Sequence, residues 1–154
     1  MIANTHYGYV GKSKAPKFTY TGNYKVRDDG VVELLTSGTI VFLEPKVIDL
    51  FMVGGGAGGG NLQGAGGGNS TGGGGGGYTR TIRRVNIPSN ASFQVIVGAG
   101  GSLQAIGGAS SFGSDYTVEG GKTVSGIVNG GAGGSVPCNL YVQRHCDSGG
   151  HRPL

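Results

Sequence analysis

Short segments in which apolar and polar residues alternate occupy the first third of the chain. Such alternation over four to eight residues is typical of half-buried strands, and the Gly, Asn, Asp and Pro residues between the segments mark turns. The segment after Thr36-Ser37-Gly38 is expected to pair back on the one before it. The predicted strands are Phe18–Thr21, Tyr24–Arg27, Val31–Leu35, Thr39–Leu43 and Val47–Val53. The last is almost continuously apolar, with Asp49 as its one charge, and is predicted to form the centre of the scaffold.

The same pattern returns after residue 77. Tyr78–Ile87 predicts a long strand, but Ile82, Val85 and Ile87 cannot share one face under strict alternation. A β-bulge at Arg83-Arg84 would restore the apolar face and turn both arginines outward. Further strands are predicted at Ser92–Val97, Ser110–Gly113 and Asp115–Val118. Since no segment shows helical periodicity over a useful length, the sequence predicts an all-β fold.

A glycine-rich stretch, Gly54–Gly77, lies between two of these strands and contains no charged residue. Two structures suit such a composition: a disordered tether, or helices of the polyproline II type packed side by side. Glycine lacks a Cβ, so neighbouring backbones can approach closely and exchange N–H···O bonds. Strands abut the stretch on both sides without the mixed composition of a linker. The sequence therefore favours packed helices, with further glycine runs at residues 98–108 and 130–134.

The composition limits the core to a modest size. Of 154 residues, 36 are glycine, 36% are hydrophobic and 13% are charged. Glycine contributes no side-chain area, so a glycine layer must be anchored by strands. We therefore expect a small β-sandwich or jelly-roll-like scaffold that carries a glycine-rich layer of polyproline-II-type (polyglycine) helices. The expected organisation is a lead-in arm at 1–16, a glycine-rich β domain at 17–134 and a divergent or truncated tail at 135–154.

The charge and the N-terminus exclude several classes of partner and location. The net charge is +4, and three of the four excess positive charges come from Arg80, Arg83 and Arg84. Nucleic-acid binding calls for a broader basic face interleaved with aromatic residues, so no nucleic-acid partner is expected. The first residues lack the apolar core of a signal peptide, and no segment approaches the length of a membrane span. We expect synthesis in a bacterial cytoplasm without a signal peptide, and no membrane insertion.

None of the motifs that could indicate nucleotide, phosphate or zinc binding has the sequence context that its chemistry requires. Gly54, Gly56 and Gly59 match a dinucleotide fingerprint, but no helix can follow them to hold a pyrophosphate. Gly121-Lys122-Thr123 resembles the end of a phosphate-binding loop that lacks its first glycine. Cys138, His145, Cys146 and His151 fit no zinc spacing. The sequence predicts a protein that is not an enzyme and has no cofactor and no metal.

Four segments together carry a resemblance to a known family: Phe18-Thr19-Tyr20-Thr21-Gly22, Val47–Gly56, Gly73–Thr79 and Val95–Gly101. In this order they resemble the glycine-rich domains at the ends of tail-fibre and tail-appendage proteins of phages and prophages. The design is similar to the polyglycine layers of phage tail-tip adhesins and to the extracellular glycine-rich domain of the anaplastic lymphoma kinase receptor. The resemblance implies a β-sandwich base, a polyglycine lattice and connecting loops that touch a receptor.

The resemblance implies a virion protein that binds a bacterial surface receptor, either a protein or a glycan, and contacts other tail-fibre subunits. Polyglycine helices offer no side chains, so specificity is expected from the residues that interrupt them. Solvated turns are the alternative interpretation of these residues, because Asn and Ser suit turns. Two alternatives stay open for the whole domain: a structural spacer of a tail appendage and a bacterial surface or matrix protein. The candidate receptor-binding residues are Asn61, Leu62, Gln63, Asn69, Ser70, Thr71, Ser102, Leu103, Gln104 and Ile106, with Ala105 between the last two.

Overall fold

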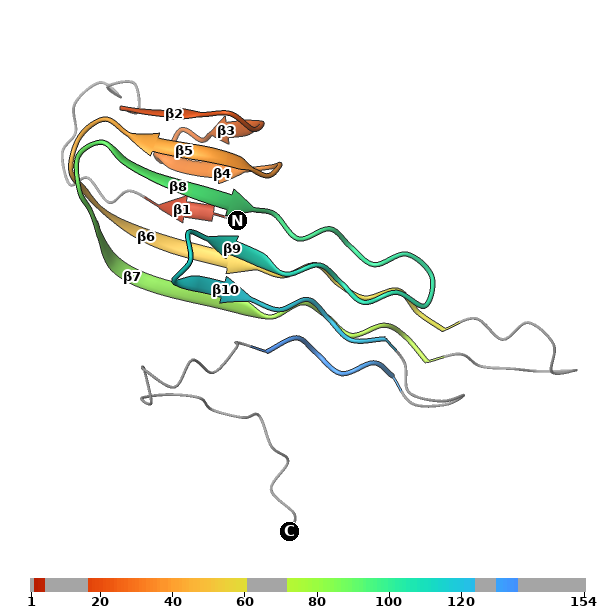
Figure 1. Cartoon of the computed structure of the whole chain (residues 1–154). Helices are drawn as coiled ribbons and strands as arrows, with labels where there is room; N and C mark the ends of the chain where they lie inside the picture. Colours follow the sequence, from red (N-terminus) through yellow and green to blue (C-terminus); the bar gives the residue numbers. More distant parts are fainter. Residues whose placement is uncertain (1, 5–16, 61–71, 124–129, 136–154) are drawn as a thin grey trace, which may run out of the picture.

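The computed structural model describes residues 2–4, 17–60, 72–123 and 130–135, which form strands and extended segments without any helix (Figure 1). The strands lie within two residues of the predicted bounds at nearly every end. They are β1 (Ile2–Asn4), β2 (Phe18–Tyr20), β3 (Tyr24–Val26), β4 (Val31–Leu34), β5 (Gly38–Phe42), β6 (Lys46–Val53), β7 (Thr79–Ile87), β8 (Ala91–Ile96), β9 (Ser110–Phe112) and β10 (Tyr116–Val118). The prediction of an all-β fold is confirmed.

The strands form two five-stranded antiparallel sheets, in the orders β3-β4-β1-β6-β7 and β10-β9-β8-β5-β2. The predicted pairing of Thr39–Leu43 with Val31–Leu35 is wrong. β4 pairs with β1 and β3, whereas β5 pairs with β2 and β8. The turn at residues 36–38 therefore carries the chain from one sheet to the other. Both strands still bury their alternate apolar residues in one core, which is why alternation alone cannot tell a hairpin from a crossing.

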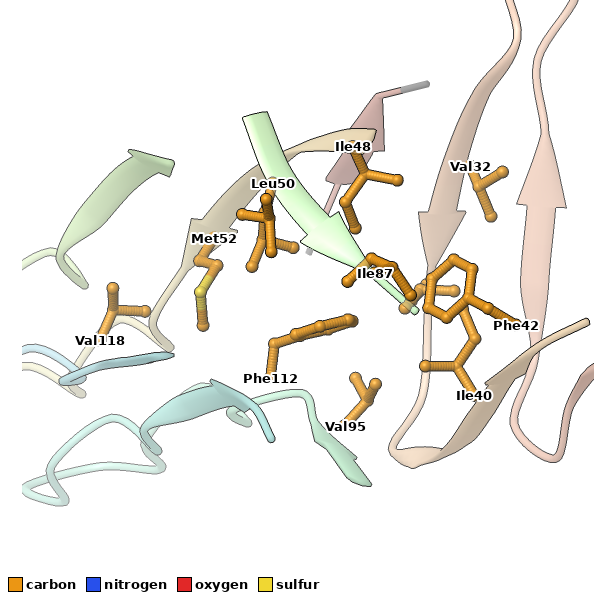
Figure 2. Close-up of a cluster of buried hydrophobic side chains, with 12 residues drawn as sticks. Val32, Ile40, Phe42, Ile48, Leu50, Met52, Ile87, Val95, Phe112 and Val118 are labelled. Carbon is orange, nitrogen blue, oxygen red and sulfur yellow. The ribbon is translucent and has the colours of Figure 1, made fainter. Parts of the chain in front are cut away.

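Apolar side chains from both sheets fill the space between them. Figure 2 shows Phe112 of β9 lying between Met52 of β6 and Val95 of β8. Its ring stacks on that of Phe93, with 4.8 Å between the ring centroids. The buried members of this core are Val32, Leu34, Ile40, Phe42, Ile48, Leu50, Met52, Val85, Ile87, Val95, Phe112 and Val118. Because the two sheets contribute to one core, the fold is a small β-sandwich.

Three aromatic rings close the sandwich at the edge formed by β2 and β3. Phe18 meets Tyr24 edge to face at 5.3 Å between centroids, and Tyr20 meets the same ring at 6.2 Å. The hydroxyl of Tyr20 donates a hydrogen bond to the carbonyl oxygen of Thr36. Partial burial raises the pKa of the Tyr20 phenol. The rings hold together β2 and β3, which belong to opposite sheets and are connected by residues 21–23.

The predicted bulge in β7 is confirmed. Leu50 pairs with Ile82 and Ile48 with Val85, so Arg83 and Arg84 together lie opposite Asp49. Both arginines are exposed, as expected. Arg84 adopts a left-handed φ of 56°, and its N–H donates to the Asp49 carboxylate at 2.9 Å. This hydrogen bond explains the acidic residue within β6: the Asp49 carboxylate accepts from a backbone N–H that the bulge removes from the ladder.

The first residues differ from the sequence prediction. Residues 1–16 were expected to form a lead-in arm, but Ile2–Asn4 form β1, which lies between β4 and β6 and pairs with both. Three residues are too few for an alternation pattern to identify, and the pairing depends on a gap that only the assembled sheet presents. The boundaries of the domain and of the C-terminal tail stay predictions.

Candidate functional site: a glycine lattice and its distal turn

Glycine-rich segments leave one end of the sandwich and run away from it side by side (Figure 1). Five of them lie next to a strand, so the sandwich fixes where they begin, and the sixth, 130–135, is joined to the others by hydrogen bonds. They are residues 54–60 after β6, 72–78 before β7, 98–102 after β8, 105–109 before β9, 119–123 after β10, and 130–135. We call them the lattice segments, and their assembly the glycine lattice.

Hydrogen bonds recur at every third residue along the lattice segments. In segment 54–60, the N–H groups of Gly54, Ala57 and Gly60 donate to segment 72–78 at 2.8 to 3.1 Å. Those of Gly55 and Gly58 donate to segment 105–109, each at 2.9 Å. Three residues per turn is the repeat of a polyproline II helix, in which successive N–H groups point in three directions. The predicted layer of packed polyglycine helices is therefore present in the described residues.

The segments are arranged in two rows of three. One row consists of 98–102, 54–60 and 72–78, and the other of 105–109, 119–123 and 130–135. Each segment bonds to its neighbours in its own row and to the nearest segments of the other row. The bonds between rows include Gly108 N to Ala99 O, Gly55 N to Gly108 O, Gly121 N to Gly55 O, Gly75 N to Lys122 O, and Gly131 N to Gly73 O, all between 2.8 and 3.0 Å.

Close packing of the segments, both within a row and between the rows, explains why most lattice positions are glycine. A Cβ built on Gly75 would lie 1.9 Å from the carbonyl oxygen of Ala132, and one on Gly55 would lie 2.0 Å from that of Ala99. A Cβ on Gly58 would lie 1.7 Å from the carbonyl oxygen of Ser102. These neighbours are backbone atoms that the hydrogen bonds of the lattice hold in place, so they cannot move aside for a side chain. Side chains are excluded there for the same reason that they are excluded from the axis of collagen.

A buried serine, Ser110, joins the lattice to the sandwich. Its hydroxyl donates to the carbonyl oxygen of Val53 at 2.6 Å and accepts from the N–H of Gly98 at 2.9 Å. These two residues are the last of β6 and the first of segment 98–102, so Ser110 ties together the points where two segments begin. This role was not predicted from the sequence. The available signal was a serine in a strand position that alternation with Phe112 predicts to be buried.

Side chains cover one face of the lattice, the outer face of the row 105–109, 119–123 and 130–135. Glu119 forms an ion pair with Lys122 at 3.1 Å and accepts a hydrogen bond from the Ser135 hydroxyl at 2.7 Å. The hydrogen bond from Ser135 lowers the pKa of the Glu119 carboxyl, and the hydrogen bond and charge of Lys122 lower it further. Lys122 thus neutralises an acidic neighbour, which agrees with the rejection of a phosphate-binding loop.

A tight turn closes the lattice between segments 98–102 and 105–109 at its far end. The N–H of Ala105 donates to the carbonyl oxygen of Ser102 at 2.9 Å, and Gln104 has a left-handed φ of 61°, as the third residue of a type II turn requires. The Gln104 N–H also donates to Gly59 at 3.0 Å, which fixes the turn to the central segment. The side chain of Leu103 is 62% exposed at the tip.

The structure therefore places four of the candidate receptor-binding residues. Ser102, Leu103 and Gln104 lie together in the distal turn, and Ile106 lies just beyond it on segment 105–109, also 62% exposed. Asn61, Leu62, Gln63, Asn69, Ser70 and Thr71 lie outside the described residues. The segments that lead to and from them end beside each other and near the turn, since Gly60 N donates to Gly72 O at 3.1 Å and Gln104 N donates to Gly59 O at 3.0 Å.

The described residues offer no group of three or more His, Cys, Asp or Glu side chains that could hold a metal ion. Cys138, His145, Cys146 and His151 lie outside them. Within the same ranges no helix is long and apolar enough to cross a membrane. What the site offers chemically is a framework of paired backbone groups with an exposed turn at its end.

Comparison with known proteins agrees with this architecture. No curated protein and no solved structure matches the chain. A family model described as a glycine-rich domain matches residues 36–151, which is more than half of the 154 residues and includes every described lattice segment. The chain therefore belongs to the glycine-rich domain family.

Proposed function

We propose that this protein is a non-enzymatic tip or adhesin domain of a phage tail fibre. In this proposal it is part of the virion, contacts other tail-fibre subunits, and binds a bacterial surface receptor through the loops between lattice segments. The observation that carries the proposal is the distal turn. Ser102–Gln104 is held by two backbone hydrogen bonds at the end of a framework whose other end is rooted in the sandwich.

The turn has the properties of a recognition loop. Leu103 and Ile106 each expose 62% of their surface, although nothing in the turn geometry demands apolar residues there. Exposed aliphatic side chains beside hydroxyl and amide groups suit contacts with a sugar or a protein loop. The hydrogen bond from Gln104 to Gly59 reduces the conformational freedom that binding would otherwise remove, and preorganisation of this kind raises affinity.

Binding of the fluorescently labelled protein to intact cells of a panel of bacterial strains, measured by flow cytometry, tests the proposal. We expect saturable binding to some strains and at least about a tenfold loss of affinity when Leu103→Ser and Ile106→Ser are combined, as for hot-spot residues. The matched control combines Leu43→Ser and Val47→Ser, since these side chains are 49% and 51% exposed on the sandwich. Undiminished binding by the folded distal variant would contradict the proposal.

A structural spacer is the second candidate function, because one face of the lattice presents glycine without side chains, as described below. A spacer would bind no strain of the panel. Loss of binding in both the distal variant and its sandwich control would indicate a receptor surface that is not confined to the turn.

A further inference from the structure

Two of the seven N–H groups of the central segment 54–60 point away from the lattice. Gly54, Ala57 and Gly60 donate to one neighbour, and Gly55 and Gly58 to another. The three-residue repeat directs the N–H groups of Gly56 and Gly59 to the third side, where no described residue accepts from them. In a hexagonal lattice this third side belongs to a further row of helices. The row 98–102, 54–60 and 72–78 thus resembles an edge strand, with regularly spaced N–H groups from which no described residue accepts.

The glycines on this side are not required by the lattice itself. Gly56, Gly73, Gly76 and Gly100 are exposed. A Cβ on Gly73 or Gly76 would meet nothing within 4 Å, and one on Gly56 or Gly100 would make contact only at 3.8 and 3.9 Å. None of them has the left-handed φ that favours glycine, which among described glycines occurs at Gly30 and Gly113.

Alanine would be the better residue at such positions within an isolated monomer. Replacing glycine by alanine at a compatible backbone conformation stabilises a protein by about 0.4–1 kcal/mol. The chain does use exposed alanine elsewhere in the lattice, at Ala99, Ala109 and Ala132. Glycine on this face leaves room for a close approach by another backbone that a methyl group would obstruct.

We propose that the glycine face, defined as Gly56, Gly59, Gly73, Gly76 and Gly100, is an interface at which a second copy of this chain adds its own lattice. The occupant must itself present a backbone without side chains, so that its carbonyl oxygens can reach and accept from the N–H groups of Gly56 and Gly59. The same row of a second copy offers such a backbone, because glycine leaves this face free of side chains. Two identical faces can meet around a twofold axis because such an interface is self-complementary. The proposal does not depend on receptor binding.

Two further observations favour a second copy. The lattice already joins segments in both directions: Gly101 donates to Gly56 between parallel segments, and Ala57 donates to Gly75 between antiparallel ones. A symmetry-related lattice can therefore bond in either orientation. The glycine face carries no charge, so two copies meet without repulsion, whereas Glu119 and Lys122 lie on the opposite face.

Sedimentation velocity across a concentration series, with the full chain, tests the proposal. We expect a reversible dimer for the unmodified protein. Gly73→Val combined with Gly76→Val should raise the dimer dissociation constant by at least about tenfold, because side chains there would separate the backbones. The control combines Ala109→Val and Ala132→Val, two exposed positions of the opposite row, and should dimerise as the unmodified protein does.

Amide exchange of Gly56 and Gly59 gives the second measurement. Both N–H groups should exchange slowly in the dimer and fast in the monomeric variant. A protein that stays monomeric at every concentration would overturn the proposal, as would a variant that dimerises like the unmodified chain. Protection of these two N–H groups in a monomer would also overturn it, since another part of the same chain would then cover the face.

Discussion

Substitution of two adjacent glycines of segment 72–78, Gly75 and Gly76, tests how closely the lattice segments pack. A Cβ on Gly75 would lie 1.9 Å from the carbonyl oxygen of Ala132 and 2.5 Å from its carbonyl carbon. A Cβ on Gly76 would meet nothing within 4 Å. The substitutions Gly75→Ala and Gly76→Ala add the same methyl group one residue apart, so propensity and solubility effects are matched and only the surroundings differ.

The expected decrease in the free energy of unfolding for Gly75→Ala follows from the hydrogen bonds that must break. Ordinary contact with the Ala132 oxygen requires a shift of more than about 1 Å, which exceeds the tolerance of a hydrogen bond. The bonds around the site are Gly75 N to Lys122 O at 3.0 Å, Ala57 N to Gly75 O at 2.8 Å and Lys122 N to Ala132 O at 2.8 Å. At about 1 kcal/mol each, their loss destabilises the protein by about 3 kcal/mol. Gly76→Ala should instead stabilise the monomer by about 0.4–1 kcal/mol.

Thermal unfolding, monitored by circular dichroism at a concentration where the protein is monomeric, measures the change in stability of both variants. For a chain of this size, about 3 kcal/mol corresponds to a decrease in Tm of roughly 6–12 °C. Amide exchange at Ala57 and Lys122 reports opening of the lattice even where the sandwich stays folded. Equal Tm values and equal exchange rates for the two variants would refute the packing that we describe.

Three further substitutions test the anchoring of the lattice and the bulge. Ser110→Ala removes two hydrogen bonds at the base of the lattice and should lower the free energy of unfolding by about 2 kcal/mol, whereas Ser111→Ala should be nearly neutral in chemical denaturation. Glu119 has a lowered pKa, so the stability it contributes is present above its ordinary pKa of 4.5 and is lost as the pH falls through the lowered pKa. The decrease in Tm between pH 7 and pH 3 should therefore be smaller for Glu119→Gln than for the unmodified protein, and an identical decrease would contradict this. Arg84→Gly relieves a left-handed φ of 56° and should raise the free energy of unfolding by about 1 kcal/mol; a loss of stability would show that the arginine side chain contributes more than its backbone strain costs.

The local elements could be predicted from the sequence because each depends on neighbouring residues. Alternation placed the strands, and the misfit among Ile82, Val85 and Ile87 located the bulge at Arg83-Arg84. The glycine runs predicted packed helices because only glycine permits such close approach. In each case the signal lies within about ten residues of the feature that it predicts.

The remaining features depend on contacts between distant segments. The positions of Ile2–Asn4 and of β5 inside their sheets are decided by which distant strands leave a side unpaired, and no local pattern records that. The order of the lattice segments is likewise set by the strands in which they are rooted. Four candidate site residues were placed at or beside the distal turn, but Ser110 was missed because its role depends on Val53 and Gly98.

Residue-by-residue amide exchange along segment 54–60 tests the central claim of a hydrogen-bonded polyglycine lattice most directly. Under monomeric conditions we predict slow exchange at Gly54, Gly55, Ala57, Gly58 and Gly60, whose N–H groups donate within the lattice, and fast exchange at Gly56 and Gly59. This period of three follows from the geometry of the packed helices alone. Uniformly fast exchange at random-coil rates throughout the segment would contradict the lattice and indicate a disordered tether.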